Sequence, residues 1–300
     1  MNRKKIKKLY EDYDYEEVYD QKITSEEDIE DLRINNNYVY LRRTIISGKI
    51  VEVEIYPIWK CRNDVPRKKK GVSREAQKKL NEKNSRKNTV RLINTNFIEK
   101  EDLYITLTYK DGYLPDEKRA RKDIQNYIAR LKRWRKRNGI TEPLKYIYSI
   151  GFEDNPEHSK KIRIHHHLII NKINRDVAED LWGKGRAESR RLKPDDFQFE
   201  GVGRYIASQG RERIGHSTNL EKPIVKKDRT RLTNRKAEKI VRNENDYKEY
   251  FEKKYEDCIY LDCNTYQSSE FPGVYFYARL RKKEVKNEWV MKSQQHLWQR

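Results

Sequence analysis

Three consecutive histidines, His165 to His167, form the pattern with the clearest chemical potential. They lie inside the apolar, β-branched segment Ile162 to Asn171, which predicts a strand. Side chains of a strand alternate between its faces, so His165 and His167 project together, about 6.6 Å apart along the backbone. Two such imidazoles can share one metal ion, whereas His166 belongs to the opposite, core face. A polar patch on an exposed strand is the alternative, but the apolar flanks make unpaired imidazoles costly.

A carboxylate, Glu153, follows the preceding predicted strand, Leu144 to Phe152. An antiparallel neighbour would bring this carboxylate to the histidine face as a hard oxygen ligand. Two imidazoles and one carboxylate suit Mg²⁺ or Mn²⁺ and leave positions open for substrate oxygens. Asp154 or Glu157 can replace Glu153, and a plain turn carboxylate is the alternative interpretation.

A tyrosine lies downstream in the glycine-rich segment Gly201 to Ser208. This segment predicts the entry to a helix or a short turn, with Tyr205 at a helix start near positive partial charge. A tyrosine in that setting can act as a nucleophile. Because the chain has 21 tyrosines, Tyr205 alone is weak evidence, and packing or surface roles are the alternative.

Three motifs in a fixed order carry a family resemblance. They are Tyr104 to Tyr109, the His-x-His motif within Arg163 to Ile170, and Arg204 to Ala207 followed by Ser217 to Pro223. In these motifs the segment from Phe97 to about Pro223 resembles the catalytic domain of the HUH-endonuclease replication initiators, the rolling-circle Rep proteins of bacteriophages and plasmids. Histidines that precede the tyrosine argue against mobilisation relaxases, in which the tyrosine usually comes first.

The resemblance implies an α+β fold, a ferredoxin-like or RRM-like palm with a central antiparallel sheet and helices on one face. It implies that Tyr205 attacks a phosphodiester of single-stranded DNA, forms a 5′-phosphotyrosine and releases a 3′-hydroxyl. The metal would offset charge on the phosphorane oxygens, and the reverse attack would rejoin the strand without ATP. One candidate nucleophile is evident, which indicates a single-tyrosine enzyme.

Two positions depart from the family pattern. Ser208 stands where members often carry a lysine three residues after the tyrosine, so we expect Arg204 or Arg211 to neutralise the phosphate instead. Gly151 stands where the acidic metal ligand often lies, so Glu153 is displaced by two residues on the same strand face.

Basic side chains are expected to hold the DNA. Pro66 to Arg91 contains eleven Lys and Arg against two Glu, and a second cluster ends the helix predicted between Pro115 and Gly139. A solvated helix face is the alternative. The predicted contacts are Lys68, Lys69, Lys70, Lys132, Arg133, Arg135, Lys136, Arg204 and Arg211.

The remaining patterns divide the chain into four segments. Residues 1–36 form an acidic extension that is more consistent with a solvated segment than with a DNA mimic. Residues 37–96 hold a hairpin, Tyr38 to Trp59 with one buried face, and a basic helix. Residues 97–225 form the catalytic domain. Residues 226–300 form a basic α/β extension with a helix at Ala237 to Tyr255 and a strand at Val274 to Leu280.

Composition favours a polyanionic partner. The 300 residues carry a formal net charge of +20 and are 39% charged and 35% hydrophobic. No run approaches the roughly 18 apolar residues of a membrane span, and no apolar signal region follows the basic N-terminus. Three scattered cysteines fit a reducing compartment. We therefore expect a protein of the bacterial host cytoplasm that does not contact the membrane.

Single-stranded origin DNA is the expected substrate. No GxxxxGK[ST] sequence is present, so a host helicase and polymerase are expected partners. A homodimer during strand closure is a further expectation. Two alternatives stay open: a noncatalytic nucleic-acid-binding protein on the same scaffold, and an HUH-type transposase, which would normally be a shorter chain.

Overall fold

The computed structural model describes residues 14–30, 32–33, 35–66, 74–113, 115–151, 164–209 and 214–284. The fold is α+β with two antiparallel sheets and several helices, which confirms the predicted palm-like class. Contacts divide the chain into two units. Unit 1 comprises residues 1–44, 51–66 and 227–300, and unit 2 comprises residues 45–50 and 67–226. The four-segment division stays a prediction.

Unit 2 is built on a five-stranded sheet in the order β7-β4-β6-β5-β8. Its strands are β4 (Leu103–Thr108), β5 (Tyr146–Gly151), β6 (His165–Ile170), β7 (Ala187–Arg191) and β8 (Gly215–His216). Buried and half-buried residues alternate along β4 and β5, as expected for strands with two different faces. The histidine segment is therefore a central strand.

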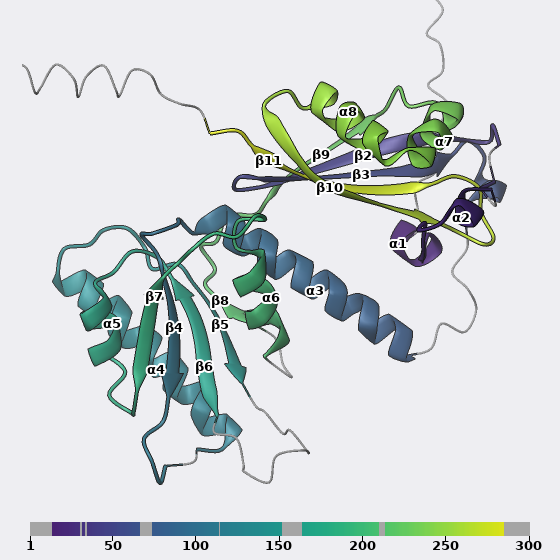
Figure 1. The fold of residues 1–300 in the computed structure, drawn as a ribbon. Coiled ribbons are helices and arrows are strands. Elements are labelled where there is room, and N and C mark those ends of the chain that lie inside the picture. Colours follow the sequence, from purple (N-terminus) through teal and green to yellow (C-terminus); the bar gives the residue numbers. More distant parts are fainter. Residues whose placement is uncertain are drawn as a thin grey trace, which may run out of the picture. The chain divides into compact units, whose positions relative to one another are not determined.

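Helices cover both faces of this sheet, rather than one face as predicted. The helices α4 (Glu117–Arg137) and α5 (Arg175–Asp180) follow the strands of one face, and α3 (Arg74–Asn96) and α6 (Glu200–Ser208) join the other (Figure 1). The first core contains Leu103, Ile105, Leu107, Ile124, Tyr127, Leu131, Leu168 and Trp182. The second contains Ile93, Phe97, Ile147, Ile169, Phe199 and Ile206. Apolar residues at alternate positions of β5 and β6 required this second cover.

Unit 1 is built on a six-stranded sheet in the order β1-β10-β11-β3-β2-β9. Its strands are β1 (Gln21–Lys22), β2 (Tyr38–Ser47), β3 (Ile50–Trp59), β9 (Ile224–Arg229), β10 (Cys258–Gln267) and β11 (Tyr275–Lys282). The helical elements are α1 (Tyr15–Val18), α2 (Glu26–Glu30), the 3-10 turn Arg62–Asp64, α7 (Asn234–Arg242) and α8 (Glu244–Lys254). The single helix predicted for this region is thus divided in two at Asn243.

The hairpin of β2 and β3 is present, but both of its faces are buried. Glu52 and Glu54 are 6% and 0% exposed, although alternation placed them on a polar face. Glu54 accepts a hydrogen bond from the Tyr15 hydroxyl at 2.7 Å and pairs with Arg43, and Glu52 accepts one from Tyr277 at 2.8 Å. These partners offset the cost of burying the carboxylates.

Part of the acidic N-terminal segment packs on the sheet of unit 1 instead of being solvated. Tyr15 and Tyr19 are 8% and 1% exposed, and the Tyr15 ring stacks on Tyr56 with a 4.0 Å centroid separation. Asp14 caps α1 by accepting hydrogen bonds from the backbone N–H groups of Glu16 and Glu17. The stacked tyrosines therefore fasten this segment to the sheet.

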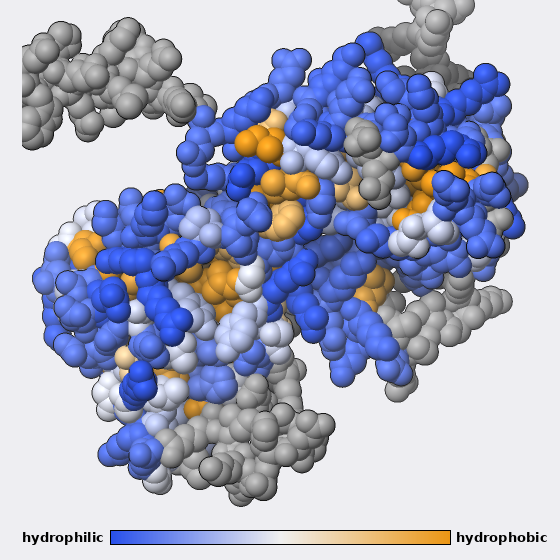
Figure 2. Space-filling model, in the orientation of Figure 1, coloured by the Kyte–Doolittle hydropathy of each residue, from blue (hydrophilic) through white to orange (hydrophobic). Residues whose placement is uncertain are grey.

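The described helices include none that is long and apolar enough to cross a membrane. Figure 2 shows a surface covered mainly by hydrophilic residues, in keeping with the 39% of charged residues.

Replacing Tyr15 should destabilise unit 1. Tyr15→Ala removes the stack on Tyr56 and the hydrogen bond to Glu54, and should lower the free energy of unfolding by about 3–5 kcal/mol. Tyr15→Phe keeps the ring and should cost about 1–2 kcal/mol. Urea denaturation of the full chain, followed by circular dichroism, measures both. Equal losses would show that the ring contributes nothing beyond its hydroxyl.

Candidate active site

The register of β6 with its neighbours places the candidate groups on one face of unit 2. His165 lies opposite Gly151 of β5, and His167 lies opposite Ser149. On the other side of β6, His167 lies opposite Thr106 of β4. The rings of His165 and His167 are 4.7 Å apart between centroids, so both imidazoles lie on the same face, as the sequence predicts.

Gly151 makes room for the His165 ring. A Cβ atom on Gly151 would lie 2.5 Å from His165 Nε2, which is closer than nonbonded atoms approach. A carboxylate at the usual family position would therefore displace this imidazole. The sequence identified Gly151 as a departure, and the structure gives its physical consequence.

The tyrosine Tyr104 holds the ring of His167. Its hydroxyl lies 2.6 Å from His167 Nδ1, and the two rings are stacked at 5.9 Å. If Nδ1 carries the proton, the lone pair of Nε2 is directed away from Tyr104. Burial, followed by the nearby His165, lowers the pKa of His167 to about 4, so the imidazole is neutral at neutral pH. Sequence reasoning gave Tyr104 no role, although its alternation with Thr106 places it on this face.

Tyr205 reaches the histidines from α6. Its hydroxyl oxygen lies 3.4 Å from His167 Nε2, and its ring is 45% exposed. It is the sixth residue of Glu200–Ser208, so it lies within the helix and not at its start. The prediction of a helix-start tyrosine was wrong because the helix begins at Glu200, before both glycines.

The helix α6 is positioned by its contacts with α3. The Asn94 side chain accepts a hydrogen bond from the backbone N–H of Phe199 at 3.0 Å. Gly203 is buried, and a Cβ atom there would lie 2.9 Å from Val90 Cγ2. Glycine thus permits the close approach of the two helices, and Ile206 is 0% exposed in the core beneath. This packing fixes the height of Tyr205 above the sheet.

The face fits a divalent metal ion in part. His165 and His167 converge, and the buried Ser149 Oγ has no hydrogen-bond partner among the described residues. A ligand or water in the site would satisfy that hydroxyl. No group of three His, Cys, Asp or Glu converges within the described ranges. The predicted third ligand Glu153 lies outside the described residues, as do Asp154 and Glu157.

Two charged residues of β7 lie on the same face and were missed by sequence reasoning. Tyr104 lies opposite Arg190, and Thr106 lies opposite Glu188. Glu188 pairs with Arg190 at 3.4 Å and with Arg186 at 3.6 Å. The side chain of Arg190 is 73% exposed, which makes it available to a phosphate. Strand pairing with β4 was the missing signal, because β7 reads as ordinary polar sequence.

The predicted DNA-binding residues are not brought together. Arg204 is exposed beside Glu200 on α6, one residue from Tyr205. Lys132 lies over the ring of Tyr146, at the end of β5 opposite to Gly151, and Arg133 and Lys136 are exposed on the same helix. Lys68, Lys69, Lys70 and Arg211 lie outside the described residues.

Arg135 is a correction to the predicted DNA contacts. Its side chain is 3% exposed and donates to the carbonyl oxygens of Lys172 at 2.8 Å and Glu142 at 2.9 Å. Arg135 therefore ties the end of α4 to two loops and does not reach the surface. Its apolar stem falls on the buried stripe of the helix, which accounts for the difference.

His166 lies on the opposite face, in the first core. Its Nε2 is 3.0 Å from the Tyr109 hydroxyl, which lies 3.4 Å from Asp123 Oδ2. Asp123 is 0% exposed and is paired with Lys184 at 3.1 Å and Arg119 at 3.2 Å. A proton on His166 Nε2 lets the chain His166 to Tyr109 to Asp123 donate in one direction. The three consecutive histidines thus serve two faces.

Residues 102–209 match the family model described as replication-associated protein, of the ORF2 type. This match supports a replication-associated protein. It runs from the start of β4 to the end of α6 and includes the two histidines and Tyr205. No curated protein and no solved structure matches the chain.

Acid should destabilise unit 2 through the buried histidines. Burial, and then His165, lowers the pKa of His166 to about 3. An unfolded histidine titrates near pH 6.5, so between these values the unfolded chain binds the extra proton. The free energy of unfolding should therefore fall below pH 6.5, by at most about 1.4 kcal/mol per pH unit for each histidine.

The variant His166→Gln should flatten this acid loss, while His216→Gln, at the exposed end of β8, should leave it unchanged. Urea denaturation at pH values from 7 down to 4 measures both profiles. An equally steep loss in His166→Gln and the unmodified chain would contradict the assignment of His166 to the core.

Proposed function

We propose that this protein is a rolling-circle replication initiator that nicks and rejoins single-stranded origin DNA through Tyr205. The observation that carries the proposal is the approach of the Tyr205 hydroxyl to His167 Nε2 at 3.4 Å. The match to replication-associated proteins over residues 102–209 supports the same role.

The side chains divide the chemistry between them. His165 and His167 would hold a Mg²⁺ or Mn²⁺ ion, with Glu153 as the proposed third ligand. When bound, such an ion neutralises charge on the phosphate oxygens. The Tyr205 oxygen attacks phosphorus as the bond to the 3′ oxygen breaks, so the 5′ phosphate becomes linked to tyrosine. Tyr104 keeps the His167 ring in the orientation that faces this oxygen.

Cations beside the site would bind the phosphates that flank the scissile bond. Arg204 lies one residue before Tyr205, and Arg190 lies on the same sheet face. Ser208, at the usual lysine position, donates its hydroxyl to the Tyr205 carbonyl oxygen at 2.8 Å and supplies no charge. Arg190 and Arg204 are therefore the proposed substitutes for that lysine, together with Arg211.

The remaining partners follow from the reaction. Nicking leaves a 3′-hydroxyl that a host polymerase would extend, and unwinding would require a host helicase. The proposed place of action is the cytoplasm of a bacterial host. Pairing of two copies during strand closure completes the proposal.

Tyr205→Phe should abolish the covalent adduct and leave oligonucleotide affinity nearly unchanged, because the ring and its packing remain. The assay incubates the full chain with origin single strand and Mn²⁺ and resolves the adduct on a denaturing gel. Tyr113→Phe, on the other sheet face, is the matched control and should form the adduct normally. An adduct in Tyr205→Phe would move the nucleophile elsewhere, with Tyr247, Tyr250 and Tyr255 tested next.

His167→Ala should reduce cleavage by at least about 10³-fold if the imidazole holds the ion, since it removes a ligand from the reacting centre. His216→Ala changes an exposed histidine of the same sheet and should retain activity. Binding of Mn²⁺, measured by isothermal titration, should be lost in the first variant and kept in the second. Normal Mn²⁺ binding by an inactive His167→Ala protein would refute the ligand role.

Salt dependence should separate the two groups of cations. Arg190→Glu with Arg204→Glu should lower the log-log salt slope of single-strand binding by about 1.4, at about 0.7 per phosphate. Lys132→Glu with Lys136→Glu, at the far end of the sheet, should change it less. Equal changes would indicate a diffuse charge effect. The noncatalytic alternative predicts binding with these slopes but no adduct under any metal.

A further inference from the structure

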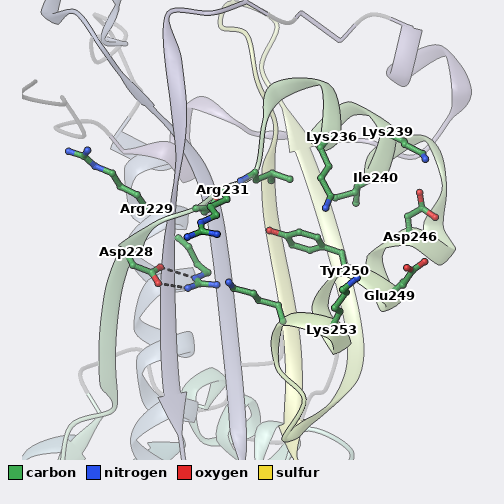
Figure 3. Close-up of a pocket in the computed structure, with 14 residues that line it drawn as sticks. Asp228, Arg229, Arg231, Lys236, Lys239, Ile240, Asp246, Glu249, Tyr250 and Lys253 are labelled. Atoms are coloured by element: carbon green, nitrogen blue, oxygen red, sulfur yellow. Dashed lines mark hydrogen bonds and ion pairs between the residues drawn. The ribbon is translucent and has the colours of Figure 1, made fainter.

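Unit 1 contains a hollow of about 840 Å³ between α7, α8 and the segment Asp228 to Leu232 (Figure 3). Its walls come from elements distant in sequence, since Arg42 of β2 also takes part. The floor includes Leu232 and Ile240, which are 7% and 4% exposed. The cationic residues around it are Arg42, Arg229, Arg231, Lys236, Lys239, Lys253 and Lys254.

The charges of this hollow are unbalanced. Its acidic residues are Asp228, Asp246 and Glu249, against seven cations. Asp228 is held by Arg42, with Nε to Oδ1 at 2.8 Å, and this pair is marked by dashes in Figure 3. Among the described residues, no carboxylate forms an ion pair with the other six cations. Cations gathered around one hollow repel each other, and a bound anion would relieve that repulsion.

A hydroxyl group reaches into the centre of the hollow. Figure 3 shows Tyr250 extending from α8 with Lys236 of α7 beside it and Arg231 across the cavity. The Lys236 ammonium lies 5.6 Å from the centre of the Tyr250 ring. Burial raises the pKa of Tyr250, so the hydroxyl stays protonated and can donate a hydrogen bond to an anionic oxygen.

The size of the hollow selects the kind of polyanion. A volume of about 840 Å³ lies within the range of pockets that enclose small ligands, so it admits a few nucleotides of a flexible strand. A duplex is too stiff to turn its phosphates into such a space, because it bends over about 150 base pairs. Several cations with a protonated hydroxyl, over an apolar floor, suit phosphodiester groups of a single strand.

We propose that this hollow of unit 1 is a second DNA site, which binds backbone phosphates of single-stranded DNA outside the unit that carries Tyr205. The inference rests on the proposed function for naming DNA as the polyanion. The site itself is independent of the cleavage chemistry, because none of its lining residues belongs to unit 2.

The test measures equilibrium binding of a fluorescent oligo-dT strand to the full chain by anisotropy. All proteins carry Tyr205→Phe, so covalent capture cannot contribute. The variant pair Lys236→Glu and Lys253→Glu should weaken binding about tenfold and lower the salt slope by about 1.4. The control pair Arg235→Glu and Lys248→Glu makes the same charge change on exposed positions of α7 and α8 outside the hollow, and should weaken binding less than twofold.

Equal weakening by both pairs would overturn the proposal, because it would show a general charge effect. Tyr250→Phe removes one hydrogen-bond donor and should weaken binding about threefold with no change in salt slope. This variant also decides the outcome if the charge-reversed protein fails to fold by circular dichroism. Unchanged affinity in Tyr250→Phe would then overturn the site.

Competition separates DNA from a free nucleotide. Unlabelled oligo-dT should displace the probe at concentrations near its own affinity, whereas deoxyadenosine triphosphate and a short duplex should require at least tenfold more. Displacement by the triphosphate at equal concentration would identify a nucleotide pocket and overturn the DNA assignment. A protein that binds oligo-dT through this hollow but never nicks DNA would refute the proposed function and leave this inference intact.

Discussion

The antiparallel register of β6 between β4 and β5 is the constraint on which the candidate site depends. Hydrogen bonds of the two ladders fix His165 opposite Gly151 and His167 opposite Ser149 and Thr106. A slip of one residue would move both imidazoles into the core and bring His166 to the open face. The site is therefore as rigid as the centre of the sheet, which suits groups that must hold one geometry during a reaction.

The core beneath β6 reinforces this register. His166 belongs to a buried chain of polar groups that ends at Asp123, and Asp123 is held by Lys184 and Arg119. A slipped strand would leave these charges without their partners, at a cost of several kcal/mol for a buried charge. The polar network behind the sheet thus protects the arrangement of the histidines in front of it.

The two units use different physical means to meet the same kind of partner. In unit 2, an exposed phenol and neutral imidazoles lie on a sheet face, with Arg190 and Arg204 near them. In unit 1, cations surround a hollow whose central hydroxyl belongs to Tyr250. The first arrangement has groups suited to reaction, and the second has groups suited to holding charge. A net charge of +20 is consistent with nucleic acid as the partner of both.

The sequence by itself determined the strands and helices with strong periodicity and the face on which each histidine lies. Alternation in Ile162 to Asn171 was sufficient, because a strand has a period of two residues. Tertiary structure alone decided which distant segments meet. The hairpin of β2 and β3 shares a sheet with β10 and β11, Glu54 is buried by Tyr15 and Arg43, and β7 brings Arg190 beside Tyr104. These contacts join residues far apart in the chain, and local patterns carry no record of such pairings.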